Sequence, residues 1–177
     1  MKYKKTDILI IGLGLAGITA AITAAEKGKK VTILTKSKSL SSGSTPWAQG
    51  GIVYKGLNDS PEKLKKDIKR AGSEHTWDAA VNHLCKNGPR LVESFLINKL
   101  QTPFDKSKDK LKRVSEGAHS DARVIYHADK TGESIHKSSL AYLESLPGVE
   151  VISNHTAIDL LTFSHHSTVS TDIYKKP

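Results

Sequence analysis

Three glycines near the start of the chain have the spacing of a turn that binds phosphate. They form a GxGxxG pattern, in which the first glycine permits a tight turn, the second lets the backbone approach a pyrophosphate, and the third lets a helix pack closely on a strand. The N-terminus of that helix would offer free N–H groups and a positive dipole end to the phosphates. The predicted cofactor-binding residues of this turn are Gly12, Leu13, Gly14, Leu15, Ala16 and Gly17.

The segments on either side of this turn raise the value of the pattern. Residues 7–11 form a short run that is apolar after Asp7, rich in β-branched residues and ends at a glycine, as a buried parallel strand should. Residues 15–26 have alanine-rich helical character, Gly28 would end the helix, and residues 30–35 are typical of a second strand. A β–α–β unit implies a right-handed crossover and a parallel sheet, so we predict an α/β, Rossmann-like fold.

The end of the second strand argues against NAD as the dinucleotide. In NAD-binding units an acid usually stands there and bonds the ribose hydroxyls. Here the strand ends in Thr35-Lys36. Lys36 would either contact the dinucleotide or its phosphates, or be a solvated strand end.

A loop rich in hydroxyls, amides and small residues follows at residues 41–52. Glycines in such a loop permit close approach to a polar cofactor, and the side chains can hydrogen-bond ring heteroatoms. In this loop the chain resembles the L-aspartate oxidase family, whose Ser-Thr-x-x-Ala-Gln-Gly-Gly segment lies along the flavin of FAD. The resemblance implies that, with Lys36 and the glycine turn, FAD contacts Ser44, Thr45, Pro46, Trp47, Ala48, Gln49, Gly50 and Gly51.

One position in this loop separates branches of the superfamily. The related succinate dehydrogenase flavoproteins have a histidine at the position of Ser44, and that histidine bonds covalently to the flavin. Serine cannot form this link, so the resemblance implies FAD that is bound non-covalently.

A second motif lies at residues 115–132 and resembles the family's Glu-Gly-x-His-Ser…Arg…Asp-x-Thr-Gly segment. The resemblance implies that Glu116 is the catalytic-site acid that faces the substrate's amino group. A partly buried carboxylate beside an ammonium is a sensible discriminator between aspartate and plain dicarboxylates. Without the resemblance, Glu116 would be interpreted as an exposed loop residue. His119 and Arg123 are expected to position other groups, and Tyr126 stands where the family usually has histidine.

The implied reaction is FAD-dependent oxidation of L-aspartate to iminoaspartate, the first step toward quinolinate and NAD, with oxygen or fumarate as the electron acceptor. The family enzyme is roughly three times longer than this chain. We therefore expect residues 1–177 to be the N-terminal portion of an FAD-binding domain that lacks the capping domain and the C-terminal helical domain. A second polypeptide is one way to complete the fold, and the chain alone is expected to be too short for the whole reaction.

Two other functions remain open at this point. One is a dicarboxylate oxidoreductase of the fumarate reductase type, against which Ser44 and Glu116 argue. The other is a non-catalytic remnant that binds FAD, adenine dinucleotides generally, or nothing.

Composition narrows the class of protein. The net charge of +9 comes from dispersed lysines without interleaved aromatic residues, so no nucleic-acid partner is expected. The apolar run from Ile8 is broken by glycines and leads into a charged segment, which argues against a signal peptide or a membrane span.

Cys85 is the one cysteine; we expect a buried thiol in a reducing cytoplasm. His165-His166 is interpreted as a polar loop, and no metal site is predicted.

The remaining elements are predicted from local signals. Asp59-Ser60-Pro61-Glu62 has the chemistry of a helix start. That helix would run to Ala71. Two more helices are expected on either side of Gly88-Pro89, at residues 76–87 and 90–98. Residues 101–115 are expected to be an exposed connection. A helix at 131–145 and strands at 149–152 and 156–163 complete the prediction.

Overall fold

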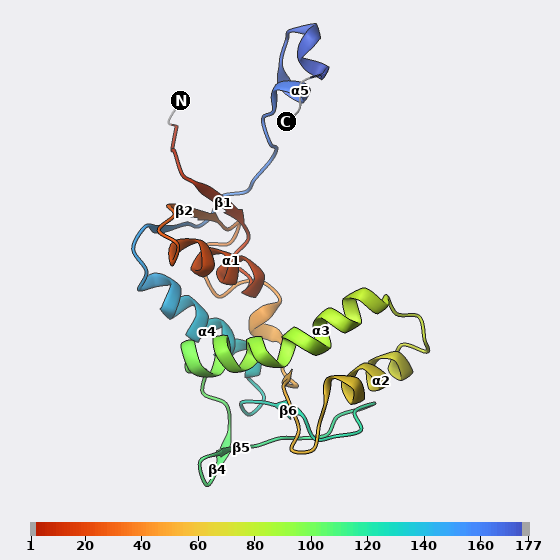
Figure 1. The fold of residues 1–177 in the computed structure, drawn as a ribbon. Coiled ribbons are helices and arrows are strands. Elements are labelled where there is room, and N and C mark those ends of the chain that lie inside the picture. The colour runs from red at the N-terminus through yellow and green to blue at the C-terminus, as the bar shows by residue number, and fades with distance from the viewer. Residues whose placement is uncertain (1–2, 175–177) are drawn as a thin grey trace.

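The computed structural model describes residues 3–174, and its centre is a three-stranded parallel sheet with the order β1-β2-β7 (Figure 1). The strands are β1 (Ile8–Ile11), β2 (Val31–Leu34) and β7 (Val149–Ile152). Ile8 pairs with Val31, and Val31 pairs with Val149. The predicted α/β fold with a parallel sheet is therefore confirmed.

Two helices contribute to the apolar core beside this sheet. Helix α1 (Leu15–Ala25) connects β1 to β2, and α4 (Thr131–Glu144) packs against α1. Ile22 of α1, Ile33 of β2 and Leu143 of α4 are each completely buried in one apolar cluster. Because apolar burial is the main favourable term in folding, this cluster is what holds β7 beside β2.

Strand β1 was predicted to be buried, and that prediction is wrong. Ile8, Leu9 and Ile11 are 37%, 48% and 58% exposed. The strand pairs only with β2, so within residues 3–174 nothing covers its other edge. A run of apolar residues predicts a strand that is suited to burial, but it does not show which neighbour would bury it.

A second part of the chain lies beside the end of α4 (Figure 1). Strand β3 (Ile52–Val53) pairs antiparallel with β6 (Val124–Ile125), and β4 (Lys106–Ser107) pairs with β5 (Lys110–Leu111) in a short hairpin. Helix α2 (Pro61–Ala71) packs against α3 (Asp78–Leu91) in this part. Ser60 caps α2 by accepting a hydrogen bond from the N–H of Lys63 at 3.2 Å, as its sequence predicted.

The prediction of two helices separated by Gly88-Pro89 is wrong. Helix α3 (Asp78–Leu91) passes through both residues and continues as a π-helix over Val92–Lys99. A proline inside a helix removes one hydrogen bond and crowds the preceding turn. Here the wider π-helical turns begin three residues later, and Val92 and Leu96 of that segment are buried in the main core. Tertiary packing therefore carries the helix across a sequence that is typical of a helix end.

The strand predicted at residues 156–163 is also absent. These residues are not regular structure until the short helix α5 (Phe163–His166), and Figure 1 shows that they lead away from the sheet. Ile158 and Leu161 are 95% and 81% exposed, because no strand of the described chain lies beside them. The strand-like sequence after Ser167 forms a 3-10 helix at Ser170–Tyr174, and residues 175–177 lie outside the described residues.

Within residues 3–174, no helix is both long enough and apolar enough to cross a bilayer.

We predict that Leu143→Ala destabilises the chain because it leaves a cavity in the main core. The expected loss in free energy of unfolding is about 2–5 kcal/mol, measured by urea denaturation. Leu84→Ala is the matched control, because Leu84 is 54% exposed on α3 and should change stability by less than about 0.5 kcal/mol. Equal effects of the two substitutions would contradict this description of the core.

Candidate FAD and substrate site

The glycine turn has the backbone geometry that its sequence predicted. Gly12 follows β1 with a φ of +106°, a conformation that favours glycine, and its N–H donates to the carbonyl of Leu34 at 2.8 Å. A Cβ at Gly17 would lie 2.1 Å from the carbonyl oxygen of Gly12. The side chain of Leu13 is buried in the core, so only its backbone is available to a ligand.

A cavity of about 380 Å³ opens at the carboxyl ends of β1 and β2. In open α/β sheets, ligands bind in the crevice at this edge. The predicted residues Gly12, Leu13, Gly14 and Lys36 line the cavity. The sequence analysis missed other lining residues, namely Ile11, Leu34, Thr35, Ser37, Ser42, Gly43, His155, Thr156 and Ala157. Residues 155–157 could have been found, because they follow a third predicted parallel strand and so must reach the same edge.

The predicted flavin loop is attached to this turn. The N–H of Leu15, in the first turn of α1, donates to Oγ1 of Thr45 at 3.2 Å. Residues Thr45–Trp47 form a short 3-10 helix, and the N–H of Gly132 donates to the carbonyl of Ala48 at 2.7 Å. A Cβ at Gly132 would lie 2.1 Å from the carbonyl oxygen of Thr45, so only glycine permits α4 to begin against this loop.

The second motif reaches the flavin loop through the pairing of β3 with β6. Beyond these strands, the Glu116 carboxylate lies 3.5 Å from the position that a Cβ at Gly50 would occupy. Glu116 and Gly50 line an open pocket of about 330 Å³ together with Gln49, Val114, Tyr126, Ala128 and Asp129. The structure therefore brings the predicted substrate acid next to the predicted cofactor loop, although the two are more than sixty residues apart in the sequence.

The expectation that Glu116 is partly buried is wrong for this chain. Its side chain is exposed, since the pocket is open to solvent on one side and no described segment covers it. The predicted loop residues Ser44, Trp47, Gln49 and Gly50 are exposed as well. What the structure provides is one open face on which the two motifs lie side by side.

Beneath that face, Arg123 is completely buried in an ion network. Its Nε and Nη2 donate to the two oxygens of Asp59 at 2.7 and 2.8 Å, and its Nη1 donates to Oδ2 of Asp67 at 2.6 Å. The same Nη1 lies 2.8 Å from Nδ1 of His119. An Arg Nη1 can only donate, so Nδ1 of His119 accepts and the proton of the neutral ring is on Nε2. The expectation that His119 and Arg123 are positioning groups fits this geometry.

The ionisation of the network follows from its partners. Burial by itself would raise the pKa of Asp67, but hydrogen bonds from Ser120 N–H, Arg123 and the Ser120 hydroxyl outweigh it and hold the pKa well below its usual range. Burial would raise the pKa of Asp59 as well, but hydrogen bonds from Arg123 oppose it, and the pKa is lowered overall. Both carboxylates raise the pKa of Arg123, and the hydrogen bonds to Asp59 have the larger effect.

The other titratable groups of this region lie outside the Arg123 network. Nδ1 of His127 lies 3.2 Å from a carboxylate oxygen of Asp105, while Tyr126 faces the open pocket instead of the network. Cys85 is buried, as predicted, and burial raises the pKa of its thiol.

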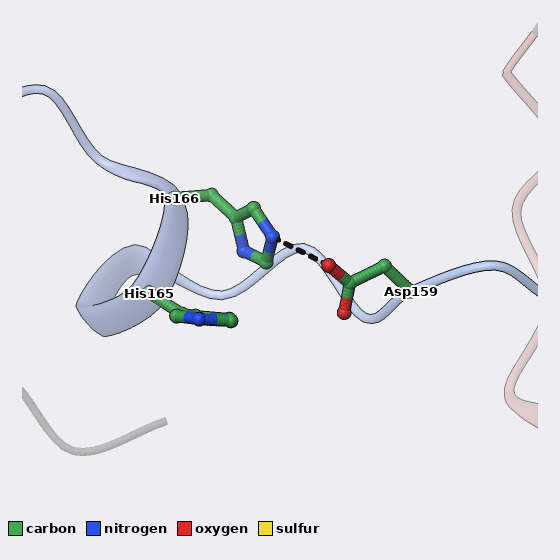
Figure 2. A group of neighbouring side chains, drawn as sticks. All are labelled: Asp159, His165 and His166. Atoms are coloured by element: carbon green, nitrogen blue, oxygen red, sulfur yellow. Dashed lines mark hydrogen bonds and ion pairs between the residues drawn. The ribbon is translucent and has the colours of Figure 1, made fainter.

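One group of metal-ligating side chains was missed by the sequence analysis. Asp159, His165 and His166 present ligand atoms within 4.8 Å of one another (Figure 2). Nε2 of His166 lies 2.9 Å from Oδ2 of Asp159, and the N–H of Thr162 donates to Nδ1 of His166 at 3.3 Å. Both ring nitrogens of His166 therefore already have hydrogen-bond partners within this segment. We interpret the group as hydrogen-bonded side chains that close an exposed turn.

A family model described as "FAD binding domain" matches residues 7–177. The chain belongs to the FAD-binding domain family. FAD is accordingly its cofactor, and the expectation drawn from the glycine turn and the flavin loop is confirmed.

Individual relatives of this FAD-binding chain agree with the resemblance. L-aspartate oxidase of Halobacterium salinarum is 37% identical over 157 residues, which are 89% of this chain and 30% of that protein. L-aspartate oxidase of Clostridium acetobutylicum is 36% identical over 160 residues, 89% of this chain and 36% of that protein. A quinol-fumarate reductase solved with menaquinol molecules shares the fold, with a TM-score of 0.82 at 24% identity over 92% of this chain and 28% of its own. The chain thus spans about a third of the length of these relatives.

The residues of the site fit an adenine dinucleotide. No described atom lies within 4 Å of a Cβ built on Gly12, so the turn leaves room for a pyrophosphate. Helix α1 begins at this turn, where its first N–H groups have no intrahelical partners. The cavity extends from there to Lys36 and His155, and the flavin loop begins on its other side at Ser44.

We predict that Gly17→Ala abolishes FAD binding, because its Cβ would force α1 away from the carbonyl of Gly12. Loss of FAD binding would be seen by titration of flavin fluorescence. Gly88→Ala is the matched control: its Cβ meets no described atom within 4 Å, and alanine favours the helix by roughly 0.5–1 kcal/mol. Normal FAD binding by Gly17→Ala would refute the proposed role of this close contact.

The Asp67 carboxylate should make stability depend on pH. Its folded pKa is lowered, so its contribution is complete above the unfolded value of about 3.9 and is lost as the pH falls below it. The difference in urea midpoint between wild type and Asp67→Asn should therefore be largest at neutral pH and shrink in acid. Asp78→Asn, which removes an exposed acid from α3, should give a small difference at every pH. A gap for Asp67→Asn that widens in acid would contradict the assignment.

Proposed function

We propose that the protein containing this chain oxidises L-aspartate to iminoaspartate. The observation that carries the proposal is the position of Glu116 beside Gly50, where a substrate ammonium over the flavin loop would meet a carboxylate. L-aspartate oxidases are also the relatives that match about 90% of the chain. The product would then enter the synthesis of quinolinate and NAD.

The residues of this chain would bind and orient. Ser44, Thr45 and Gln49 would hydrogen-bond the cofactor without a covalent link, because Ser44 offers no imidazole. Bound FAD supplies the acceptor for the two electrons that leave the substrate. Glu116 would accept hydrogen bonds from the substrate ammonium and so prefer an amino dicarboxylate over succinate.

We further propose that residues 1–177 are the N-terminal portion of a larger FAD-binding domain. The exposed Glu116 pocket and the uncovered edge of β1 support this, as does the greater length of the relatives. Holding substrate over the flavin and excluding water would fall to segments beyond this portion, in a longer chain or in a second polypeptide. A cytoplasmic location is proposed because the single cysteine, Cys85, is a free thiol.

The first test is the visible absorbance spectrum of the purified protein before and after acid precipitation. We expect a flavin spectrum whose chromophore is released into the supernatant, as for FAD bound without a covalent link. Flavin that stays with the precipitate would contradict the role of Ser44. A protein that remains colourless with added FAD would favour a non-catalytic remnant.

Substrate choice is tested by adding L-aspartate or succinate to the FAD-loaded protein and recording the change in the flavin spectrum. We expect a response to L-aspartate, weakened about tenfold in apparent affinity by Glu116→Gln, which corresponds to about 1.4 kcal/mol. Glu144→Gln, a change at an exposed acid on α4, is the control. A stronger response to succinate than to L-aspartate would support a fumarate reductase-type enzyme instead.

A further inference from the structure

Glu116 lies in a turn whose shape is set by backbone contacts. Val114 and Val124 form a two-way bridge, with N–H to carbonyl distances of 2.9 and 3.2 Å, that closes the hairpin carrying the turn. Inside the turn, the N–H of His119 donates to the carbonyl of Glu116 at 2.9 Å. Because the Glu116 side chain is exposed, its location depends on this backbone and not on packing around it.

A single carboxylate from another element fastens this turn from outside. Oδ2 of Asp67, on α2, accepts hydrogen bonds from the N–H and the hydroxyl of Ser120, each at 2.8 Å. The same oxygen accepts from Nη1 of Arg123 at 2.6 Å. One turn further along α2, Arg70 donates to the carbonyl of Ala118. The turn is therefore attached to α2 at two of its residues, Ala118 and Ser120, and Arg123, which follows the turn, bonds to α2 as well.

Removing these two charges from water costs free energy that an apolar contact would not cost. Asp67 is 4% exposed and Arg123 is completely buried, so both charges are withdrawn from water. A buried ion pair often adds no stability over packed apolar residues of similar volume. Its benefit is geometric, since a carboxylate that accepts three directed hydrogen bonds fixes the turn more narrowly than apolar contact does.

We infer that Asp67 is a positioning residue for substrate recognition: it holds the 115–120 turn so that the Glu116 carboxylate faces Gly50, and through Arg123 it orients His119. Asp67 belongs to neither sequence motif and does not line the Glu116 pocket. The inference rests on the proposed function for its substrate, L-aspartate, but not for the geometry of the turn.

The test is a double-mutant cycle between Asp67→Asn and Glu116→Gln in the FAD-loaded protein that contains this chain. Asparagine keeps the shape of Asp67, and Asp59 still balances the charge of Arg123. We expect Asp67→Asn to weaken L-aspartate binding about tenfold while the Kd values for FAD and for succinate change by less than about twofold. In the Glu116→Gln background, Asp67→Asn should add no further loss, because both changes act through one carboxylate.

Two outcomes would overturn the inference. One is additive losses in the double mutant, and the other is an equal weakening of L-aspartate and succinate binding, as a general structural defect would produce. Asp78→Asn is the control and should leave all three Kd values unchanged.

Failure of the proposed function is separately visible. If wild type binds FAD but does not respond to L-aspartate, amide hydrogen exchange of residues 115–120 decides the positioning role. Exchange about tenfold faster in Asp67→Asn than in wild type would support it, and identical exchange would overturn it.

Discussion

The open face of this protein depends on the burial of one guanidinium. Arg123 joins the end of the Glu116 hairpin to Asp59, which precedes α2, and to Asp67 within α2. A cation with five donors in a fixed plane satisfies this role better than lysine would, because it can bond two carboxylates and a ring nitrogen at once. Arg123 also directly precedes β6, and its carbonyl accepts a hydrogen bond at 2.8 Å from the N–H of Tyr54, the residue after β3.

The two chemical motifs are brought together in two ways. Glycines permit close backbone approach, at Gly17 on the turn and at Gly132 against the flavin loop. Strand pairing does the rest, since β3 continues from the flavin loop and β6 from the Glu116 hairpin. The cofactor cavity and the Glu116 pocket consequently lie at opposite ends of one segment, residues 42–51. A movement of that segment would therefore alter the lining of both.

Sequence reasoning was most successful where the signal is local. The β–α–β unit, the Ser60 cap, helix α4 and strand β7 each follow from a few adjacent residues, and all are present. It was wrong where the structure of a segment depends on a partner that is distant in the sequence. Strand β1 is exposed because no described segment covers its second edge, and residues 156–163 have no neighbouring strand to pair with. The helix through Pro89 likewise depends on core contacts of Val92 and Leu96. The carboxylate partners of Arg123 lie 56 and 64 residues away, so no spacing rule could reveal them.

The parallel pairing of β2 with β7 has a consequence for how the chain acquires its structure. Val31 and Val149 are neighbours in the sheet, yet about two thirds of the described chain lies between them. During synthesis, the edge of β2 that pairs with β7 stays unpaired until β7 has left the ribosome. Non-local pairings of this kind close slowly, because the entropy of a long loop must be lost before the contacts form. The nascent chain is therefore most vulnerable to misassembly and to chaperone capture during that interval.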